Sequence, residues 1–234
     1  MDAARLELLI VPAYDEAERL PALLAELRRS LPELAVLVID DGSHDATAAV
    51  AARAGARVVR HPFNLGYGAA LQTGYKYALA HGVERLVQMD ADGQHLPAEV
   101  PGLLDPLRRG DCDLVVGSRF LEPSDYRMGI VRSLGRHAFR GLARAAGLAI
   151  TDPTSGFQAM NRRALALFTA DWYPSDYPDV DVLVLAARAG LRLREHPVRM
   201  AAGVRPSTLH SGWKPIYYVY KMLLSMWAAT GRSG

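Results

Sequence analysis

The first half of the chain alternates apolar runs with segments of helical periodicity, and short polar connections join them. Five apolar runs predict strands, and they lie at residues 6–14, 35–43, 56–61, 85–90 and 113–120. Four intervening segments predict helices, and they lie at residues 17–31, 45–55, 66–82 and 97–110. A regular strand–helix alternation is typical of a mostly parallel sheet with helices on both faces, so we expect an α/β fold.

The second half departs from this alternation. Residues 127–147 predict a basic amphipathic helix, because five arginines and one histidine fall between Arg127 and Arg144 without an acidic residue. A turn-rich segment that leads into a helix, a further helix and a strand follow, at residues 151–165, 177–190 and 191–200.

The composition is that of a soluble globular protein, and it excludes several classes. The chain has 234 residues, of which 50% are hydrophobic and 22% are charged, and this suits one α/β domain with or without an appendage. A formal net charge of +2 gives no case for a nucleic-acid-binding protein. The lone cysteine, Cys112, rules out an internal disulfide and a cysteine-based metal site, and it favours a reducing compartment.

The apolar stretches are too short for a membrane-spanning or secreted protein. The run at residues 6–13 is interrupted by Glu7 and Pro12, which is unlike a signal peptide. No stretch approaches the ~20 apolar residues that a transmembrane helix needs. We therefore expect a cytoplasmic protein that can lie on a membrane without crossing it.

Charged or polar clusters follow four of the predicted strands. They are Tyr14-Asp15-Glu16, Asp40-Asp41, Asp90-Ala91-Asp92 and Ser118-Arg119. Polar loops and aspartate helix caps explain any one of these clusters taken alone. Because ligands of parallel sheets bind at the carboxyl ends of the strands, the four clusters together favour a functional site.

Asp90 and Asp92 stand two residues apart at the end of a buried apolar run, in the stretch LVQMDADGQH. Carboxylates this close raise each other's pKa, and a divalent cation between them removes that conflict. Mg²⁺ and Mn²⁺ prefer oxygen ligands and keep water or phosphate oxygens in the remaining positions. The pair therefore predicts a cation that clamps a diphosphate and neutralises the charge of a leaving nucleotide.

Three other interpretations of this pair have weaker support. Phosphatases of the haloacid-dehalogenase kind carry Asp-x-Asp after their first strand, whereas this pair follows the fourth predicted strand and precedes Gly93 and Gln94. A dinucleotide-binding loop follows the first strand and needs a third glycine, but here Leu71 comes after Gly66 and Gly68. Plain surface carboxylates are the third interpretation, and the motifs around the pair argue against it.

Six motifs occur in order along the chain with familiar spacing. They are IVPAYDEAERLPALL, VLVIDDGSHDAT, NLGYGAALQTGYKYA, VQMDADGQHLPAEV, VVGSRF and DPTSGFQAMNRRAL. Together they resemble the family 2 glycosyltransferases, most closely the branch of dolichyl-phosphate mannose synthase and the bacterial polyprenyl-phosphate glycosyltransferases. The resemblance extends from Leu6 to Leu224. It implies a GT-A (Rossmann-like) fold, a nucleotide-diphosphate sugar as donor, and Mg²⁺ or Mn²⁺ as cofactor.

The resemblance assigns donor-binding roles to residues at the strand ends and to one arginine further along. These residues are Pro12, Ala13, Tyr14, Glu16, Asp40, Asp41, Gly66, Gly68, Asp90, Ala91, Asp92, Gln94 and Arg205. In the family pattern Asp90 and Asp92 hold the metal and the diphosphate, and Arg119 faces a phosphate. Two simpler explanations stay open, because the glycines can mark a plain helix start and Arg119 can form a surface salt bridge.

The acceptor side depends on the chemistry of the attacking oxygen. A phosphate oxygen is already ionised near neutral pH and needs cations to hold it, whereas a hydroxyl needs a base. The resemblance places five residues on the acceptor side, namely Arg127, Arg132, Ser133, Ser155 and Gly156. Asp181 is a candidate base or orienting group, and otherwise a favourable charge at a helix N-terminus. The catalytic candidates are Asp92, Asp181, Arg119 and Arg132.

Two features of some family members are missing from this sequence. One is the Gln-x-x-Arg-Trp motif of processive members, which argues against a polysaccharide synthase, and the other is a C-terminal transmembrane pair. Residues 211–234 instead predict an aromatic-rich amphipathic helix and tail that anchor at a membrane interface, dock on the core or bind a membrane partner. The expected catalytic domain spans residues 1–210, with a nucleotide-sugar half at 1–119 and an acceptor half at 120–210.

The expected activity is inverting, metal-dependent transfer of one sugar from a UDP- or GDP-sugar to a polyprenyl phosphate, dolichyl or undecaprenyl, at the cytoplasmic membrane face. Two alternatives stay open, namely transfer to a hydroxyl of a soluble glycan or small molecule, and a non-catalytic donor-binding partner subunit. The expected partners are the donor, the lipid phosphate, and a membrane surface or membrane partner protein, with no nucleic acid. Association into a homo-oligomer is left open.

Overall fold

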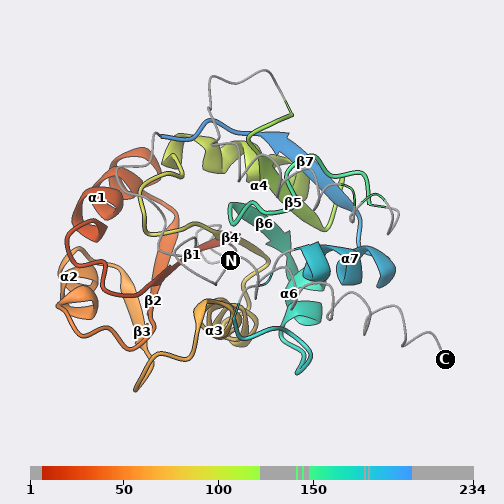
Figure 1. Cartoon of the computed structure of the whole chain (residues 1–234). Coiled ribbons are helices and arrows are strands. Elements are labelled where there is room, and N and C mark those ends of the chain that lie inside the picture. Colours follow the sequence, from red (N-terminus) through yellow and green to blue (C-terminus); the bar gives the residue numbers. More distant parts are fainter. Residues whose placement is uncertain are drawn as a thin grey trace.

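The computed structural model describes residues 7–121, 141, 144, 148–176, 178 and 180–201 (Figure 1). The predicted amphipathic segment at 211–234 and most of the basic segment at 127–147 lie outside these residues. Four predicted site residues also lie outside them, namely Arg127, Arg132, Ser133 and Arg205. The assignments made for these segments and residues stay predictions.

The five strands predicted in the first half are present, and two more follow in the second half. The strands are β1 (Glu7–Ala13), β2 (Ala35–Asp40), β3 (Arg57–Arg60), β4 (Arg85–Gln88), β5 (Leu114–Ser118), β6 (Gln158–Asn161) and β7 (Leu193–Pro197). The helices are α1 (Leu20–Ser30), α2 (Thr47–Arg53), α3 (Tyr67–Ala80), α4 (Val100–Arg108), α6 (Arg162–Phe168) and α7 (Val180–Arg188), with a 3₁₀ turn, η2 (Pro97–Glu99), before α4. No helix in the described part of the chain combines the length and the apolar character needed to cross a membrane.

The strands form one sheet in the order β3-β2-β1-β4-β6-β5-β7. Strand β1 pairs in parallel with β2 and β4, β2 with β3, and β5 with β7, whereas β6 runs antiparallel to both β4 and β5. The expected mostly parallel α/β sheet is therefore confirmed. The carboxyl ends of β1, β2, β4 and β5 share one edge of this sheet, as the clustered polar motifs require.

Strand β6 differs from the expectation of a turn-rich segment at 151–165. Its central residue Ala159 pairs with Val87 of β4 on one side and Val115 of β5 on the other. A four-residue strand carries too little sequence periodicity to be recognised locally, and its two neighbours supply the pairing that stabilises it.

Helices cover both faces of the sheet, as expected from the strand–helix alternation (Figure 1). Along β1, Leu8 and Ile10 pack toward the layer that contains α3, α6 and α7. The intervening Leu9 and Val11 pack toward the layer of α1, α2 and α4. This period of two divides the core into two layers, so that each helix layer supports the strand ends from its own side.

Candidate active site

The Asp-Ala-Asp loop follows β4 directly, at the carboxyl edge of the sheet. Ala91 is buried, whereas Asp90 and Asp92 are partly exposed. The two oxygens of Asp92 accept hydrogen bonds from Gln94, one from its backbone N–H at 2.9 Å and one from its Nε2 at 2.6 Å. The Asp90 Oδ1 accepts a hydrogen bond from the Tyr67 hydroxyl at 2.8 Å. Both carboxylates are therefore held in defined orientations.

His95 is a buried, neutral side chain that is hydrogen-bonded to the backbone of this loop. It is 5% exposed, and its ring stacks on Phe157 with 4.7 Å between the centroids. Its Nδ1 accepts a hydrogen bond from the Asp90 N–H at 3.0 Å, so the ring proton belongs on Nε2, which lies 3.8 Å from the Asp90 Oδ2. Burial lowers the pKa of His95, although the charges of Asp90 and Asp92 oppose that shift. His95 positions the loop without adding a permanent charge.

The loop after β1 brings a third carboxylate toward the pair. Burial raises the pKa of Glu16, a hydrogen bond from Arg19 opposes this, and the charge of Asp92 adds to it. The Glu16 backbone N–H donates to the Thr47 Oγ1 at 2.9 Å, which fixes the loop to α2. The predicted donor residues at the end of β1 divide in two groups: Pro12 and Ala13 are buried, whereas Tyr14 is 41% exposed.

Asp40 and Asp41, at the end of β2, are buried and bonded within the protein. The Asp41 carboxylate accepts from the N–H groups of Leu65 and Gly66, both at 2.9 Å, and its Oδ1 lies 2.7 Å from the His61 Nδ1. Asp40 accepts from the Ser43 N–H at 3.0 Å. Asp41 thus anchors the loop that leads into α3. Contacts of either carboxylate with a donor stay predictions.

Gly66 and Gly68 permit a close backbone approach, and the approaching segment belongs to the chain itself. A Cβ on Gly66 would lie 2.7 Å from the Ser175 carbonyl oxygen, and one on Gly68 would lie 2.1 Å from that of Pro174. Gly66 also has a φ of 104°, which favours glycine. The glycines therefore serve packing at the N-terminus of α3, and a donor contact by them is untested.

Arg119 is bound to Asp152 in a bidentate ion pair, with Nε at 2.6 Å and Nη2 at 2.7 Å from the two carboxylate oxygens. The side chains are 16% and 0% exposed, so this is a largely buried pair and not the surface salt bridge considered above. Glu195 of β7 in turn accepts from the N–H groups of Thr151 and Asp152, at 2.8 and 2.9 Å. Asp152 and Glu195 therefore orient Arg119, and a contact of Arg119 with phosphate stays a prediction.

The turn before β6 lies directly against the Asp90 side chain. A Cβ on Gly156 would lie 3.0 Å from the Asp90 Oδ2 and 3.1 Å from the Tyr67 hydroxyl oxygen. Ser155 is buried, and its Oγ accepts from the Phe157 N–H at 3.3 Å. Both predicted acceptor residues of this turn thus lie close to the Asp-Ala-Asp loop. Binding of an acceptor by them stays a prediction.

Asp181 lies in the first turn of α7 and is 8% exposed. Its Oδ1 accepts a hydrogen bond from the Val182 N–H at 2.9 Å, and its negative charge is favourable near the positive end of the helix dipole. Burial raises the pKa of Tyr173 well above its usual value, and the charge of Asp181 adds to that effect. The position of Asp181 in the first turn of α7 fits a favourable charge at a helix N-terminus, and its role as a base stays a prediction.

The carboxylate pair suits a hard cation that shares its ligands with a diphosphate. In the described ranges, three or more His, Cys, Asp or Glu side chains nowhere gather in a metal-holding arrangement. Two carboxylates completed by phosphate and water oxygens are a common way to bind Mg²⁺. The glycine at position 156 leaves the Asp90 Oδ2 uncovered by a side chain from that turn. The residues present therefore fit Mg²⁺ or Mn²⁺ bound together with a diphosphate.

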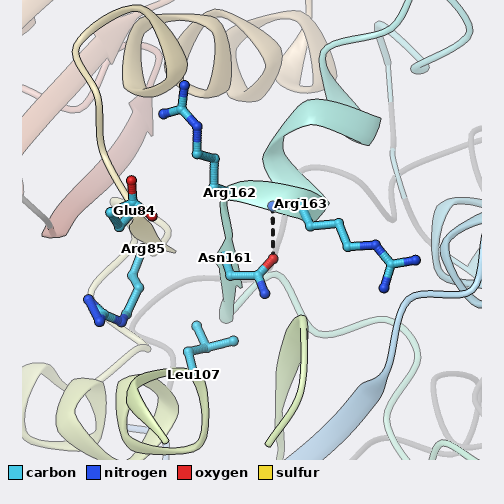
Figure 2. A pocket seen from close by; sticks show the side chains of 6 residues that line it. All are labelled: Glu84, Arg85, Leu107, Asn161, Arg162 and Arg163. Carbon is cyan, nitrogen blue, oxygen red and sulfur yellow. Dashed lines mark hydrogen bonds between the residues drawn. The ribbon is translucent and has the colours of Figure 1, made fainter. Parts of the chain in front are cut away.

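A hollow at the opposite edge of the sheet does not resemble a cation or diphosphate site (Figure 2). It measures about 200 Å³ and is lined by Glu84, Arg85, Leu107, Asn161, Arg162 and Arg163. Arg85 begins β4, whereas the Asp-Ala-Asp loop follows the end of the same strand. Figure 2 shows the three guanidinium groups pointing away from one another, so they do not converge on one ligand.

Three residues that orient groups at the site were not among the predicted site residues, namely His95, Asp152 and Glu195. Two of them stand inside the quoted motifs, as the histidine of DADGQH and the aspartate of DPTSGF, and Tyr67 was matched only as part of the loop before the third helix, with no contact to Asp90 foreseen. Their position in a motif was the available signal. Glu195 stands on a strand outside every motif, and only the folded chain brings it to Thr151 and Asp152.

The comparisons with known proteins agree with this geometry. The family model of glycosyl transferase family 2 matches residues 8–168. Two relatives are each 35% identical: a polyprenol monophosphomannose synthase of Mycolicibacterium smegmatis, over 68% of this chain and 62% of that one, and an undecaprenyl-phosphate mannosyltransferase of Micrococcus luteus, over 82% of each.

Solved structures confirm the fold. A glucosyl-3-phosphoglycerate synthase from Mycobacterium tuberculosis, in complex with Mn²⁺ and UDP-glucose, matches with a TM-score of 0.71 and 24% identity, over 95% of this chain and 80% of that one. This likeness shows the GT-A architecture that the motifs implied. From the family match and the two relatives, the chain belongs to glycosyl transferase family 2 and is a glycosyltransferase.

Proposed function

We propose that this enzyme transfers one sugar from a nucleotide-diphosphate sugar to a polyprenyl phosphate. The observation that carries the proposal is the oriented Asp90–Asp92 pair at the carboxyl edge of the sheet, in a chain whose 35%-identical relatives are named for transfer to lipid phosphates. A UDP- or a GDP-sugar is the proposed donor. The proposed location is the cytoplasmic face of the membrane, with residues 211–234 as the contact to lipid or to a membrane partner.

The donor is held by the residues at the strand ends in this proposal. Asp90 and Asp92 would hold Mg²⁺ or Mn²⁺, which would supply positive charge to the departing diphosphate. Gln94 keeps both Asp92 oxygens in place, at 2.9 and 2.6 Å. Arg119, fixed by Asp152, provides a guanidinium beside the same loop, where its charge acts on His95. A preoriented cation next to the leaving group stabilises the charge that develops in the transition state.

The reaction balances without a general base. An oxygen of the lipid phosphate, already ionised near neutral pH, attacks the anomeric carbon on the face opposite the nucleotide. A carbon–oxygen bond forms to the acceptor while the bond to the diphosphate oxygen breaks, so the configuration inverts and no proton moves. We propose Arg127, Arg132, Ser133 and the turn at Ser155 and Gly156 as the acceptor side, with Arg205 near the diphosphate.

The test is a panel of UDP- and GDP-sugars assayed for nucleoside diphosphate release and for sugar extracted into organic solvent, with and without undecaprenyl phosphate and Mn²⁺. We expect extractable sugar only when lipid phosphate is present, and a loss of about 10²–10³-fold in Asp92→Asn. Asp105→Asn, an exposed change on α4, is the matched control and keeps full activity. If sugar is transferred only to soluble hydroxyl acceptors, the lipid phosphate is not the acceptor and this part of the proposal is wrong. If the donor binds without any turnover, the proposed transfer itself is wrong.

A further inference from the structure

We infer that Tyr67 is a positioning residue for Asp90, and that its hydroxyl sets how tightly the Asp90–Asp92 pair binds a divalent cation. This inference rests on the cation that the proposed function places between the two carboxylates. Tyr67 is the first residue of α3, whereas Asp90 follows β4, so the contact joins segments 23 positions apart.

The hydrogen bond directs the Asp90 carboxylate. The Tyr67 hydroxyl donates to Oδ1 at 2.8 Å, and the Asp90 backbone N–H is bonded to His95 at 3.0 Å. A carboxylate with one oxygen bonded to a fixed donor has one preferred rotation. Its other oxygen, Oδ2, faces Gly156, where a Cβ would lie only 3.0 Å away. The Tyr67 hydroxyl therefore selects one orientation of the Asp90 carboxylate, and the glycine at position 156 leaves Oδ2 uncovered in that orientation.

The position of Tyr67 is itself fixed from two sides. Before it, the Asp41 carboxylate accepts from the N–H groups of Leu65 and Gly66. After it, the N–H groups of Gly68 and Ala69 donate to the carbonyl oxygens of residues 176 and 175, both at 2.9 Å. The first turn of α3 thus cannot move without breaking several hydrogen bonds. Through Tyr67, this rigid turn determines the geometry of a carboxylate on a different strand.

The physical consequence concerns metal affinity more than the chemical step. Hydrogen bonds to a ligating carboxylate orient it before the ion arrives, and removing such a partner typically weakens metal binding 10–100-fold. Without the hydroxyl, the Asp90 carboxylate gains rotational freedom that cation binding must then remove. At saturating metal the same carboxylate geometry is restored, so turnover recovers.

The experiment compares Tyr67→Phe with wild type, because phenylalanine keeps the ring and removes the hydroxyl that donates to Asp90. Binding of Mn²⁺ is titrated by electron paramagnetic resonance with and without saturating nucleoside diphosphate, and turnover is measured against Mn²⁺ concentration. We expect a 10–100-fold weaker Mn²⁺ affinity, the same rise in the Mn²⁺ concentration for half-maximal rate, and a maximal rate within a factor of a few of wild type. Tyr77→Phe, which removes a hydroxyl from the same helix where it bonds Arg57 at 3.4 Å, leaves all three unchanged.

Gly156→Ala provides a second variant, because the added Cβ would lie 3.0 Å from the Asp90 Oδ2 and 3.1 Å from the Tyr67 hydroxyl oxygen, so it should also weaken Mn²⁺ binding. If both variants bind Mn²⁺ as wild type does, the positioning role is wrong while the proposed transferase stands. If wild type binds no Mn²⁺ and transfers sugar equally well in chelator, the cation assignment fails and the inference fails with it. Weaker Mn²⁺ binding in Tyr67→Phe with an unchanged melting temperature supports the inference directly.

Discussion

Arginine–carboxylate pairs occur at both edges of the sheet, and their surroundings differ. At the carboxyl edge, the side chains of Arg119 and Asp152 are 16% and 0% exposed. At the opposite edge, Arg192 and Arg163 approach the buried Asp113 with side chains that are 57% and 58% exposed. Water screens the second kind of pair and scarcely reaches the first. At the active-site edge the buried ion pair therefore fixes the position of a side chain. At the opposite edge the arginines stay largely in water, and their ion pairs constrain the structure less.

The largest expected effect follows from breaking the buried pair. Asp152→Asn leaves the Arg119 guanidinium without a carboxylate in a mostly buried position, and breaking such a pair typically costs about 3–5 kcal/mol. Urea unfolding of the variant and of wild type gives this difference. A loss below about 1 kcal/mol would place this pair in the same class as the exposed pairs of the far edge, and would remove the contrast between the edges.

The fold and the position of the candidate site could be predicted from the sequence, whereas the contacts that orient its side chains could not. The strand–helix alternation and the clusters after four strands predict the sheet and the edge that carries the site, because both depend on local patterns. The role of Asp41 as an anchor for the loop before α3 is different, because it depends on which N–H groups the fold brings to the carboxylate. Glu195 illustrates the same limit, since its two partners stand more than forty positions away.

Strand β6 shows a further limit of local patterns. Its residues Gln158–Asn161 show no clear alternation of apolar and polar side chains. The strand is stabilised by its antiparallel pairing with β4 on one side and β5 on the other. Gly66 and Gly68 were assigned donor-binding roles, with a plain helix start as the simpler explanation, and the structure shows another segment of the chain packed closely against both. The approaching group is the 174–176 segment of the chain, which no sequence pattern relates to α3.

An intermediate effect is expected from pH at the far edge. Burial of Asp113 opposes ionisation, but hydrogen bonds from Arg192 and Asn161 outweigh it and lower the pKa of Asp113 to about 2. A carboxyl whose pKa is lower in the folded state stabilises the fold above its unfolded pKa of about 4, and this contribution is lost as the pH falls from 4 toward 2. We expect about 1–2 kcal/mol, reduced by the exposure of the arginines.

The measurement is urea unfolding between pH 2 and 6 for wild type and Asp113→Asn. The asparagine variant should lose less stability on acidification than wild type, and Asp105→Asn, whose carboxylate is exposed, should behave as wild type does. Identical acid profiles for wild type and Asp113→Asn would mean that this carboxyl titrates alike in the folded and unfolded chain.

The smallest expected effect comes from Arg163→Ala. The Arg163 Nη1 lies 3.4 Å from the Asp113 Oδ2, at the long end of a hydrogen bond. The same carboxylate already accepts from the Arg192 N–H at 2.8 Å and from Asn161 at 2.9 Å. Removing a redundant, solvent-exposed partner should change the free energy of unfolding by no more than about 0.5 kcal/mol. A loss comparable to that of Asp152→Asn would show that the exposed arginines hold the far edge together, and that exposure is then a poor guide to the strength of these pairs.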